Sequence, residues 1–287
     1  MNQRCDGKAD CSEGLDEEDC KLFTTFTGYN ENLVPPSVDG KSKFSINISV
    51  TIDDIIKINE NEGFFHTKYT IIRQWFNPQL TYKNLKADPN LNVLSAEDMN
   101  QMWKPWMTLE NMRNKDDNEK TDRRDRMLIV TNQEFRFEKS NRNHLHNTEL
   151  FNGSENAIHL ERQLSTNWIC NYKMKWYPFD SEICTMQFRH FEDNIELIPI
   201  SVNYTGPYEL TQHFIKEISI CSLHLPKGSG VIVEVIMGRP LFGALLTVFL
   251  PTGILVILSH MVKTFSTEYL EMVIEVNLTL LLVLATM

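Results

Sequence analysis

The run from Pro240 to Val262 constrains the fold most strongly, because its 23 residues include no Asp, Glu, Lys or Arg. Arg239 and Lys263 bracket it. A helix rises 1.5 Å per residue, so this run would span about 34 Å against a hydrocarbon core of about 30 Å. It therefore predicts a transmembrane helix, with a buried helix of a globular protein as the alternative. Pro251 is compatible with a membrane helix if neighbouring groups satisfy the carbonyl that it leaves unpaired.

A second helix is expected over about 271–287, where polar and apolar residues share one face. The residues of this stripe, spaced three, three, four and three apart, are Glu271, Ile274, Asn277, Leu281 and Leu284. Polar groups inside a membrane are costly and usually face a cavity, so the stripe predicts a water-lined path. For Glu271, a place in the headgroup zone at the helix start is the alternative.

Composition narrows the class of protein. The 287 residues predict about two domains, and six cysteines favour an oxidising, extracellular compartment. Thirty-eight acidic residues against 28 basic ones give a net charge of -10, which argues against nucleic acid as a partner. We find no nucleophile elbow, phosphate-binding glycine loop or zinc-protease helix motif, so we do not expect an enzyme. The chain starts without an apolar signal core and stops inside an apolar run, so we expect both ends to be truncated.

From Asp39 onward the pattern changes to β-strands. The alternation of Phe44, Ile46, Ile48, Val50 and Ile52 with polar or small residues is typical of a half-buried strand. Similar runs follow at 65–75 and 231–237, with turn clusters between them. We therefore expect a mainly β extracellular domain, an antiparallel β-sandwich, followed by transmembrane α-helices. The charged stretches 110–126 and 139–149 are expected to be exposed excursions.

Three Asn-x-Ser/Thr sequons fit a secreted surface, and we expect glycosylation at Asn47, Asn152 and Asn203. Asn277 also matches, but it lies in the apolar run and is not expected to carry a glycan. Histidines offer a metal alternative, with His213, Cys221 and His224 near one another in sequence. A zinc site needs three or four convergent ligands, and these strand residues show no such convergence.

Cys170 and Cys184 enclose thirteen residues that include Trp176-Tyr177-Pro178-Phe179-Asp180. A disulfide closing a loop of this size would remove about 3 kcal/mol of unfolded-state entropy. Pro178 and its aromatic neighbours would stiffen the segment into a strut. An ordinary extracellular disulfide with a proline turn is the alternative.

This loop, followed about 55 residues later by Arg239-Pro240 and the uncharged run, resembles the signature of the Cys-loop (pentameric) ligand-gated ion channels. The resemblance covers roughly 39–287. It implies a Cys170–Cys184 disulfide, a small extracellular ligand, and five subunits around a pore in the plasma membrane, in contact with lipid. It also implies a multi-pass chain with an extracellular N-terminal domain. A non-conducting receptor or adhesion protein that binds a protein partner is the alternative function.

The N-terminal segment resembles the second half of a low-density-lipoprotein-receptor class A module, because acidic residues alternate with Cys5, Cys11 and Cys20. The resemblance implies a Cys5–Cys20 disulfide and Ca²⁺ held by Asp6, Asp10, Asp16 and Glu17. A solvated acidic linker is the alternative. We therefore divide the chain into this partial module at 1–21, a ligand-binding domain at 22–238, and a transmembrane region at 239–287. No cofactor is expected for the channel itself.

The resemblance also suggests ligand-binding residues. It places Trp75, Trp103 and Phe191 near aromatic positions of the binding loops, although Trp106 stands where the family usually has an acid. The third loop, at about 222–230, has neither an adjacent cysteine pair nor an aromatic residue, so an ammonium-binding box would be incomplete. A plain core role is the alternative for Trp75 and Trp103.

In the resembled family the second helix lines the pore, and Leu284 aligns with its hydrophobic gate. Anion-selective relatives carry Pro-Ala-Arg at the inner mouth, whereas this chain has Val273-Ile274-Glu275. Cation-selective relatives carry an acidic ring where Ile274 stands, so the chain fits neither pattern. Because Glu271 lies on the predicted pore stripe, we expect a cation-permissive pore, with an anion channel as the alternative.

Overall fold

The structure is a computed structural model that describes residues 20–38, 40, 43–113, 125–132, 150–223, 225–262 and 274–279. The predicted N-terminal module lies outside these residues, apart from the half-buried Cys20, which is disulfide-bonded, and Lys21. The predicted excursions at 110–126 and 139–149 also lie largely outside them.

The chain divides into two compact units. The first unit comprises Met1–Cys170, Cys184–Gly206 and Ile218–Glu234. The second unit comprises Asn171–Ile183, Pro207–Glu217 and Val235–Met287. The disulfide loop and the start of the apolar run therefore belong to the same unit.

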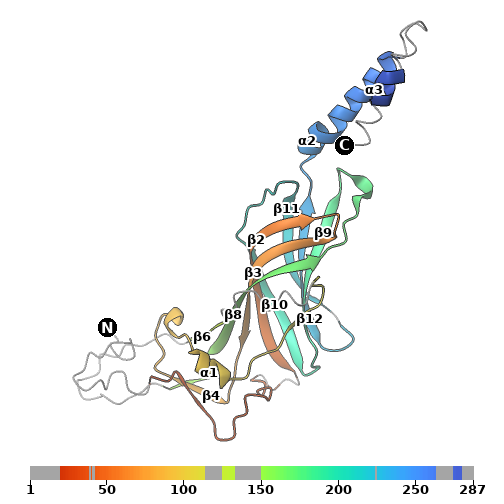
Figure 1. Ribbon diagram of the computed structural model, residues 1–287. Helices are drawn as coiled ribbons and strands as arrows, with labels where there is room; N and C mark the ends of the chain where they lie inside the picture. Colours follow the sequence, from red (N-terminus) through yellow and green to blue (C-terminus); the bar gives the residue numbers. More distant parts are fainter. Residues whose placement is uncertain are drawn as a thin grey trace, which may run out of the picture. The chain divides into compact units, whose positions relative to one another are not determined.

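The described residues form a mainly β fold (Figure 1). The strands are β1 (Phe23–Thr25), β2 (Phe44–Asn59), β3 (Phe64–Trp75), β4 (Leu80–Lys83), β5 (Thr108–Leu109), β6 (Arg126–Val130), β7 (Leu150–Asn152), β8 (Ala157–Ile169), β9 (Ser181–His190), β10 (Ile195–Tyr204), β11 (Phe214–Leu223) and β12 (Ser229–Gly238). They build a three-stranded sheet β1-β4-β7, a five-stranded sheet β10-β2-β3-β8-β6 and a four-stranded sheet β11-β12-β9-β5. This arrangement agrees with the predicted β-sandwich.

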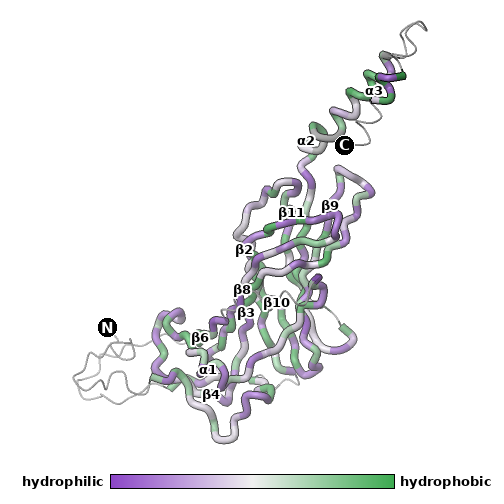
Figure 2. The backbone as a smooth tube through the Cα atoms, viewed as in Figure 1, coloured by the Kyte–Doolittle hydropathy of each residue, from purple (hydrophilic) through white to green (hydrophobic). Residues whose placement is uncertain are grey.

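Period-two burial builds the core, and it confirms the strands predicted from alternation. In β2, the side chains of Phe44, Ile46, Ile48, Val50 and Ile52 are at most 5% exposed. Val231, Val233, Val235 and Met237 of β12 are fully buried. Figure 2 shows hydrophobic and hydrophilic residues interleaved along the strands. Each buried aliphatic side chain contributes about 1.5–3 kcal/mol, so this alternation fixes which face of each strand points inward.

One ladder departs from the predicted antiparallel pattern. β10 pairs with β2 in parallel, from Ile195 opposite Phe44 to Tyr204 opposite Ile52. The ladders β2–β3 and β3–β8 are antiparallel, as predicted. β9 belongs to the four-stranded sheet, so the chain changes sheets before β10 begins and can enter beside β2 in the same direction. A local hairpin could not produce this pairing.

The apolar run near the C-terminus is divided. It consists of α2 (Leu241–Ala244), a π-helix (Leu245–Phe249) and α3 (Leu250–Val262). The single transmembrane helix predicted over about 240–262 is thus not found: within the described ranges, no helix is both long enough and apolar enough to cross a membrane. The division lies directly before Pro251. Proline has no N–H to donate to the carbonyl four residues earlier, and wider π turns occur where this ladder is interrupted.

Short helical turns complete the described elements. They are a 3₁₀ turn at Pro89–Leu91, α1 at Ala96–Asn100 and a second 3₁₀ turn at Met174–Trp176. Ser95 caps α1, because its side chain accepts a hydrogen bond from the Asp98 backbone N–H at 3.1 Å.

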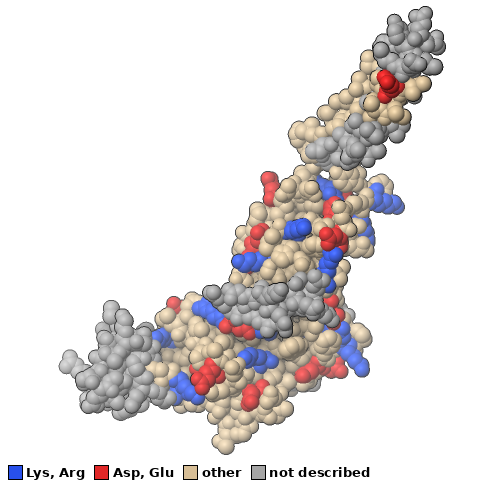
Figure 3. Space-filling view, in the orientation of Figure 1, with Lys and Arg blue, Asp and Glu red and all other residues tan. Residues whose placement is uncertain are grey.

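Charges of both signs are intermixed on the face of the molecule drawn in Figure 3. Arg126 and Glu161 form a partly exposed pair of opposite charges, with Nη1 and Oε2 3.3 Å apart. Such a pair contributes at most about 1 kcal/mol. Arg73 is the contrasting case, since its side chain is 5% exposed and donates from Nη1 to the Pro105 carbonyl at 2.8 Å. Burial lowers the pKa of Arg73 to about 10, so it stays charged at neutral pH.

We predict that stability depends on pH through two histidines. Burial lowers the pKa of His159 and of His190 from the ordinary 6.5. The unfolded chain therefore binds protons more readily than the folded chain, and the free energy of unfolding decreases as the pH falls below about 6.5. Urea unfolding between pH 7.5 and pH 5 should show this decrease, and the His159→Gln/His190→Gln double variant should show a smaller one. An unchanged slope would contradict this origin.

Candidate functional site

The disulfide loop is fixed at its base. Cys170 and Cys184 are bonded, with their Cα atoms 5.1 Å apart, and both are buried. This is the pairing that the family resemblance implies. The Cys170 N–H also donates to the Gly63 carbonyl at 2.9 Å, in the turn between β2 and β3. Gly63 has φ +68°, a conformation that suits glycine, and a Cβ there would lie 3.3 Å from the Cys170 carbonyl.

Inside the loop, polar groups hold the backbone and aromatic rings face outward. The Lys173 N–H donates to both carboxylate oxygens of Glu182, at 2.9 Å each. The Phe179 N–H donates to the Trp176 carbonyl at 2.7 Å. The side chains of Trp176 and Phe179 are nevertheless 71% and 73% exposed. The loop thus presents an ordered apolar tip that is available for contact with another surface.

Asp180 links the loop to Arg239, the residue immediately before Pro240 and α2. Arg239 Nε lies 3.0 Å from each carboxylate oxygen of Asp180, and the two side chains are 7% and 3% exposed. The guanidinium also stacks 4.9 Å from the centroid of Tyr177. A buried pair with this geometry couples two segments strongly, because separating it leaves an uncompensated charge away from water. The pair therefore ties the disulfide loop to the residue that precedes the helical run.

Asp180→Asn should destabilise the protein strongly. The substitution removes the buried carboxylate charge beside the Arg239 guanidinium, so the free energy of unfolding should fall by about 3–5 kcal/mol. Glu161→Gln, which breaks the partly exposed pair with Arg126, is the matched control and should cost less than about 1 kcal/mol. Chemical unfolding of the detergent-purified protein measures both. Equal effects of the two substitutions would refute the role assigned to the buried pair.

Two of the predicted ligand-binding aromatics are core residues. Trp75 is 1% exposed and Trp103 is 6% exposed. Their rings pack edge to face, with centroids 6.0 Å apart, and Trp103 also packs on Phe44 at 5.3 Å. This is the core role that the sequence left open for both residues. With their faces covered by each other and by Phe44, these rings have little surface left for a ligand.

The third predicted aromatic, Phe191, is 54% exposed and stands just after β9. The Arg189 guanidinium lies 4.6 Å from its ring centroid. Arg189 Nη1 is 3.0 Å from a Glu110 oxygen, and Nη2 donates to the Lys227 carbonyl at 3.3 Å. We call Glu110, Arg189, Phe191 and Lys227 the Phe191 cluster. It joins the ends of β5 and β9 to the loop between β11 and β12.

Glycine lets that loop approach β9 closely. Gly228 has φ +77°, and a Cβ on it would meet the His190 carbonyl oxygen at 2.1 Å. Its N–H donates to the Asp193 carboxylate at 2.7 Å. The Leu197 N–H donates to Ser229 Oγ at 2.8 Å. The β11–β12 loop is therefore held against the segment that joins β9 to β10.

Sequence reasoning missed the partners of these residues. Arg189 and Phe191 are two positions apart, which is the spacing that places side chains on one face of an extended chain. Glu110 becomes a neighbour only through the pairing of β5 with β9, in which Leu109 lies opposite Phe188. The charge at position 189 could have been noticed from the sequence, but its counter-ion could not.

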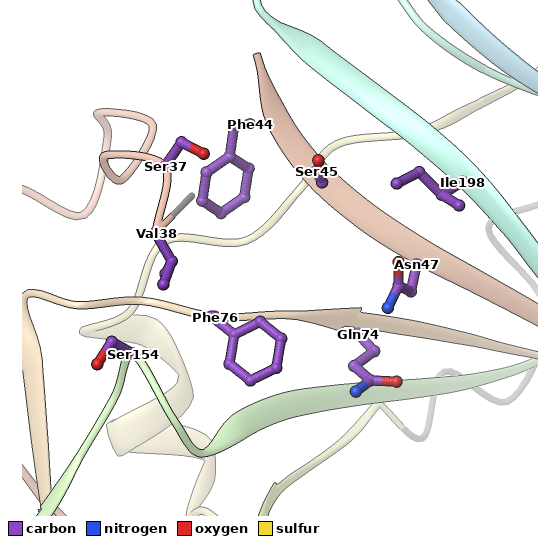
Figure 4. Close-up of a pocket in the computed structure, with 9 residues that line it drawn as sticks. All are labelled: Ser37, Val38, Phe44, Ser45, Asn47, Gln74, Phe76, Ser154 and Ile198. Atoms are coloured by element: carbon purple, nitrogen blue, oxygen red, sulfur yellow. The ribbon is translucent and has the colours of Figure 1, made fainter. Parts of the chain in front are cut away.

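A cavity of about 300 Å³ lies elsewhere in the first unit (Figure 4). Its lining combines apolar and polar side chains, namely Ser37, Val38, Phe44, Ser45, Asn47, Gln74, Phe76, Ser154 and Ile198. Asn47, a predicted glycosylation site, is half-buried in this wall and lies between the paired strands β3 and β10. The other two sequon residues, Asn152 and Asn203, are exposed. Glycosylation at the three positions stays a prediction.

Of the predicted pore stripe, Ile274 and Asn277 are described, and Glu271, Leu281 and Leu284 lie outside the described residues. Ile274 is 58% exposed in a helical segment at 274–279. The Asn277 side chain accepts a hydrogen bond from Ser259 of α3 at 2.8 Å. In this single chain Asn277 thus contacts the preceding helix. The pore role of the stripe stays a prediction.

Two possible metal sites can be compared with the described part of the chain. Within it, no three His, Cys, Asp or Glu side chains gather as they would around a metal ion. His213 is buried and Cys221 is an exposed free thiol, while His224 is outside the described residues. The proposed calcium ligands Asp6, Asp10, Asp16 and Glu17, and Cys5, are outside as well.

Comparison with known proteins adds an independent finding. The profile of the family described as neurotransmitter-gated ion-channel ligand binding domain matches residues 19–220. The chain is 23% identical over 186 residues to neuronal acetylcholine receptor subunit beta-4 of Bos taurus, covering 64% of this chain and 32% of that protein. It is 24% identical to the Homo sapiens subunit beta-4, covering 64% and 31%. The chain thus spans about a third of the length of these relatives.

Proposed function

The chain belongs to the neurotransmitter-gated ion-channel ligand-binding domain family, and we propose that it is a subunit of an extracellular ligand-gated ion channel. The observation that carries the proposal is the buried Asp180–Arg239 pair, which ties the disulfide loop to the residue before the helical run. A ligand-binding domain needs such a link if ligand binding is to move a pore. A receptor that only binds a partner does not.

We propose that the ligand acts at the Phe191 cluster. β9 connects this cluster covalently to the disulfide loop, because the strand begins at Ser181, next to Asp180, and ends at His190. A ligand that moves the β11–β12 loop displaces β9. Asp180 moves with it, because it is bonded to the first residue of that strand. Arg239 passes this change to α2, and the ligand shifts the population from closed to open in proportion to its preference for the open state.

The proposal extends to the whole protein. Five such subunits surround a pore in the plasma membrane, the region 239–287 contributes membrane-spanning helices, and a ring of Leu284 closes the pore by excluding water. The chain is multi-pass with its N-terminal domain outside the cell, and its ligand is a small molecule. Residues 1–21 bind Ca²⁺ as part of a complete class A module. The exposed rings of Trp176 and Phe179 suit the loop for contact with the membrane-spanning part.

Expression of the full-length gene in oocytes should yield ligand-evoked currents. Under voltage clamp, we expect at least one member of a panel of amines, amino acids, protons and zinc to open the channel. Surface biotinylation provides the control for delivery to the membrane. Protein that reaches the surface and gives no current with any of these ligands would instead support the partner-binding alternative.

The proposed channel should pass cations. Five copies of Glu271 at the inner mouth attract cations, whereas Glu275 lies off the predicted pore face. Reversal potentials should follow sodium when sodium and chloride are replaced in turn, and Glu271→Gln should lower the conductance more than Glu275→Gln. A reversal potential that follows chloride and ignores sodium would reject cation selectivity.

A further inference from the structure

One face of the Phe191 ring is already covered by a cation of this chain. A ligand ammonium binds an aromatic face within about 6 Å of the ring centroid, and the Arg189 guanidinium stands 4.6 Å from that of Phe191. The carboxylate that would serve as counter-ion is occupied too, since Glu110 pairs with Arg189 at 3.0 Å. A cationic ligand that approached this face would find both the ring and the Glu110 carboxylate already engaged by Arg189.

Two features keep Arg189 in this place. Its Nη2 donates to the Lys227 carbonyl at 3.3 Å, so the β11–β12 loop helps to hold the guanidinium. The same loop is fixed by the hydrogen bond from the Gly228 N–H to Asp193 at 2.7 Å. Arg189 is 21% exposed and Glu110 is 33% exposed, so the cluster is still reachable from solvent.

We infer that Arg189 determines ligand specificity at this site by excluding organic ammonium ions. This inference rests on the proposed function, in which the ligand acts at the Phe191 cluster. The guanidinium occupies the ring face and neutralises Glu110, so the natural ligand is a molecule that does not need an ammonium on Phe191. Replacing Arg189 by a neutral residue frees the ring and the carboxylate together and creates an ammonium site.

The neutral variant is expected to fold. Arg189 Nε is buried and, among the described residues, has no hydrogen-bond partner. A substitution at this position therefore removes an unsatisfied donor as well as an ion pair near the surface, and the two effects oppose each other. Glutamine keeps an amide that can still donate to the Lys227 carbonyl.

The chain offers a matched control with the same chemistry at another place. Arg113 lies 4.7 Å from the ring centroid of Phe64 and 2.9 Å from a Glu62 oxygen. This second trio reproduces the cation, the ring and the carboxylate of the Phe191 cluster, and Lys57 Nζ also lies 5.8 Å from the Phe64 centroid. The control variant is therefore Lys57→Gln/Arg113→Gln, which removes both cations from that ring. If Arg189 is special because of its site, this double variant will not create ammonium binding.

The test uses the full-length receptor in detergent, with tetramethylammonium as the probe and saturation-transfer NMR as the readout. Arg189→Gln and Arg189→Ala should bind the probe at least about tenfold more tightly than the unmodified protein, as expected for a freed cation–π and ionic site. Arg189→Lys and Lys57→Gln/Arg113→Gln should remain like the unmodified protein. Adding Glu110→Gln to Arg189→Gln should reverse most of the gain.

No gain in either neutral variant, with circular dichroism and the Cys170–Cys184 disulfide unchanged, would overturn the inference. An equal gain in Lys57→Gln/Arg113→Gln would also overturn it, because the effect would then belong to any aromatic ring from which a cation of the chain is removed. Binding is measured without gating, so this result is independent of whether the channel conducts. Currents from the unmodified receptor without a gain in Arg189→Gln would leave the proposed function standing and reject the inference alone.

Discussion

The buried ion pair between Asp180 and Arg239 is the interaction on which the functional interpretation depends. It lies where the disulfide loop meets the residue before the helical run, with both side chains almost fully buried. A buried pair is weak evidence for stability, because desolvation offsets much of the attraction between the charges. It is better explained as a connection, since the two segments can separate only by breaking the buried contact between Asp180 and Arg239.

Covalent and hydrogen-bonded contacts fix the ends of the loop that carries Asp180. The Cys170–Cys184 bond closes the loop, and the Cys170 N–H donates to the Gly63 carbonyl. Alternating burial along β2 fixes which face of that strand points into the core of the first unit. The Phe191 cluster is built on the end of β9, where Arg189 donates to the Lys227 carbonyl of the β11–β12 loop.

Much of this could be predicted from the sequence, for identifiable reasons. Strands such as β2 can be recognised because apolar and polar residues alternate along them. The alternation arises because one face of the strand must exclude water. The same periodicity identifies Trp75 as core, since it is in phase with the buried Tyr69 and Ile71. The parallel pairing of β10 with β2 and the Arg189–Glu110 pair depend on partners far away in the chain. No local pattern encodes them.

The helical run illustrates a different limit. Its lack of charge predicts burial in an apolar medium, but hydropathy does not report the interruption that Pro251 introduces into the hydrogen-bond ladder.

Phe191 shows that the same residue type can have two different roles. From the sequence alone, an aromatic residue after a strand is a candidate for ligand binding. Only the position of Arg189 in the structure shows that one face of this ring is already covered.

The most direct test of the central claim is a double-mutant cycle on agonist sensitivity. Asp180→Asn, Arg239→Gln and the double variant would be expressed in the full-length receptor, and the agonist concentration for half-maximal current would be measured for each. If the pair couples the loop to the helices, the double variant should resemble either single variant, with an interaction energy of at least about 1 kcal/mol. Shifts that simply add would show that the two residues act independently, and they would contradict the account.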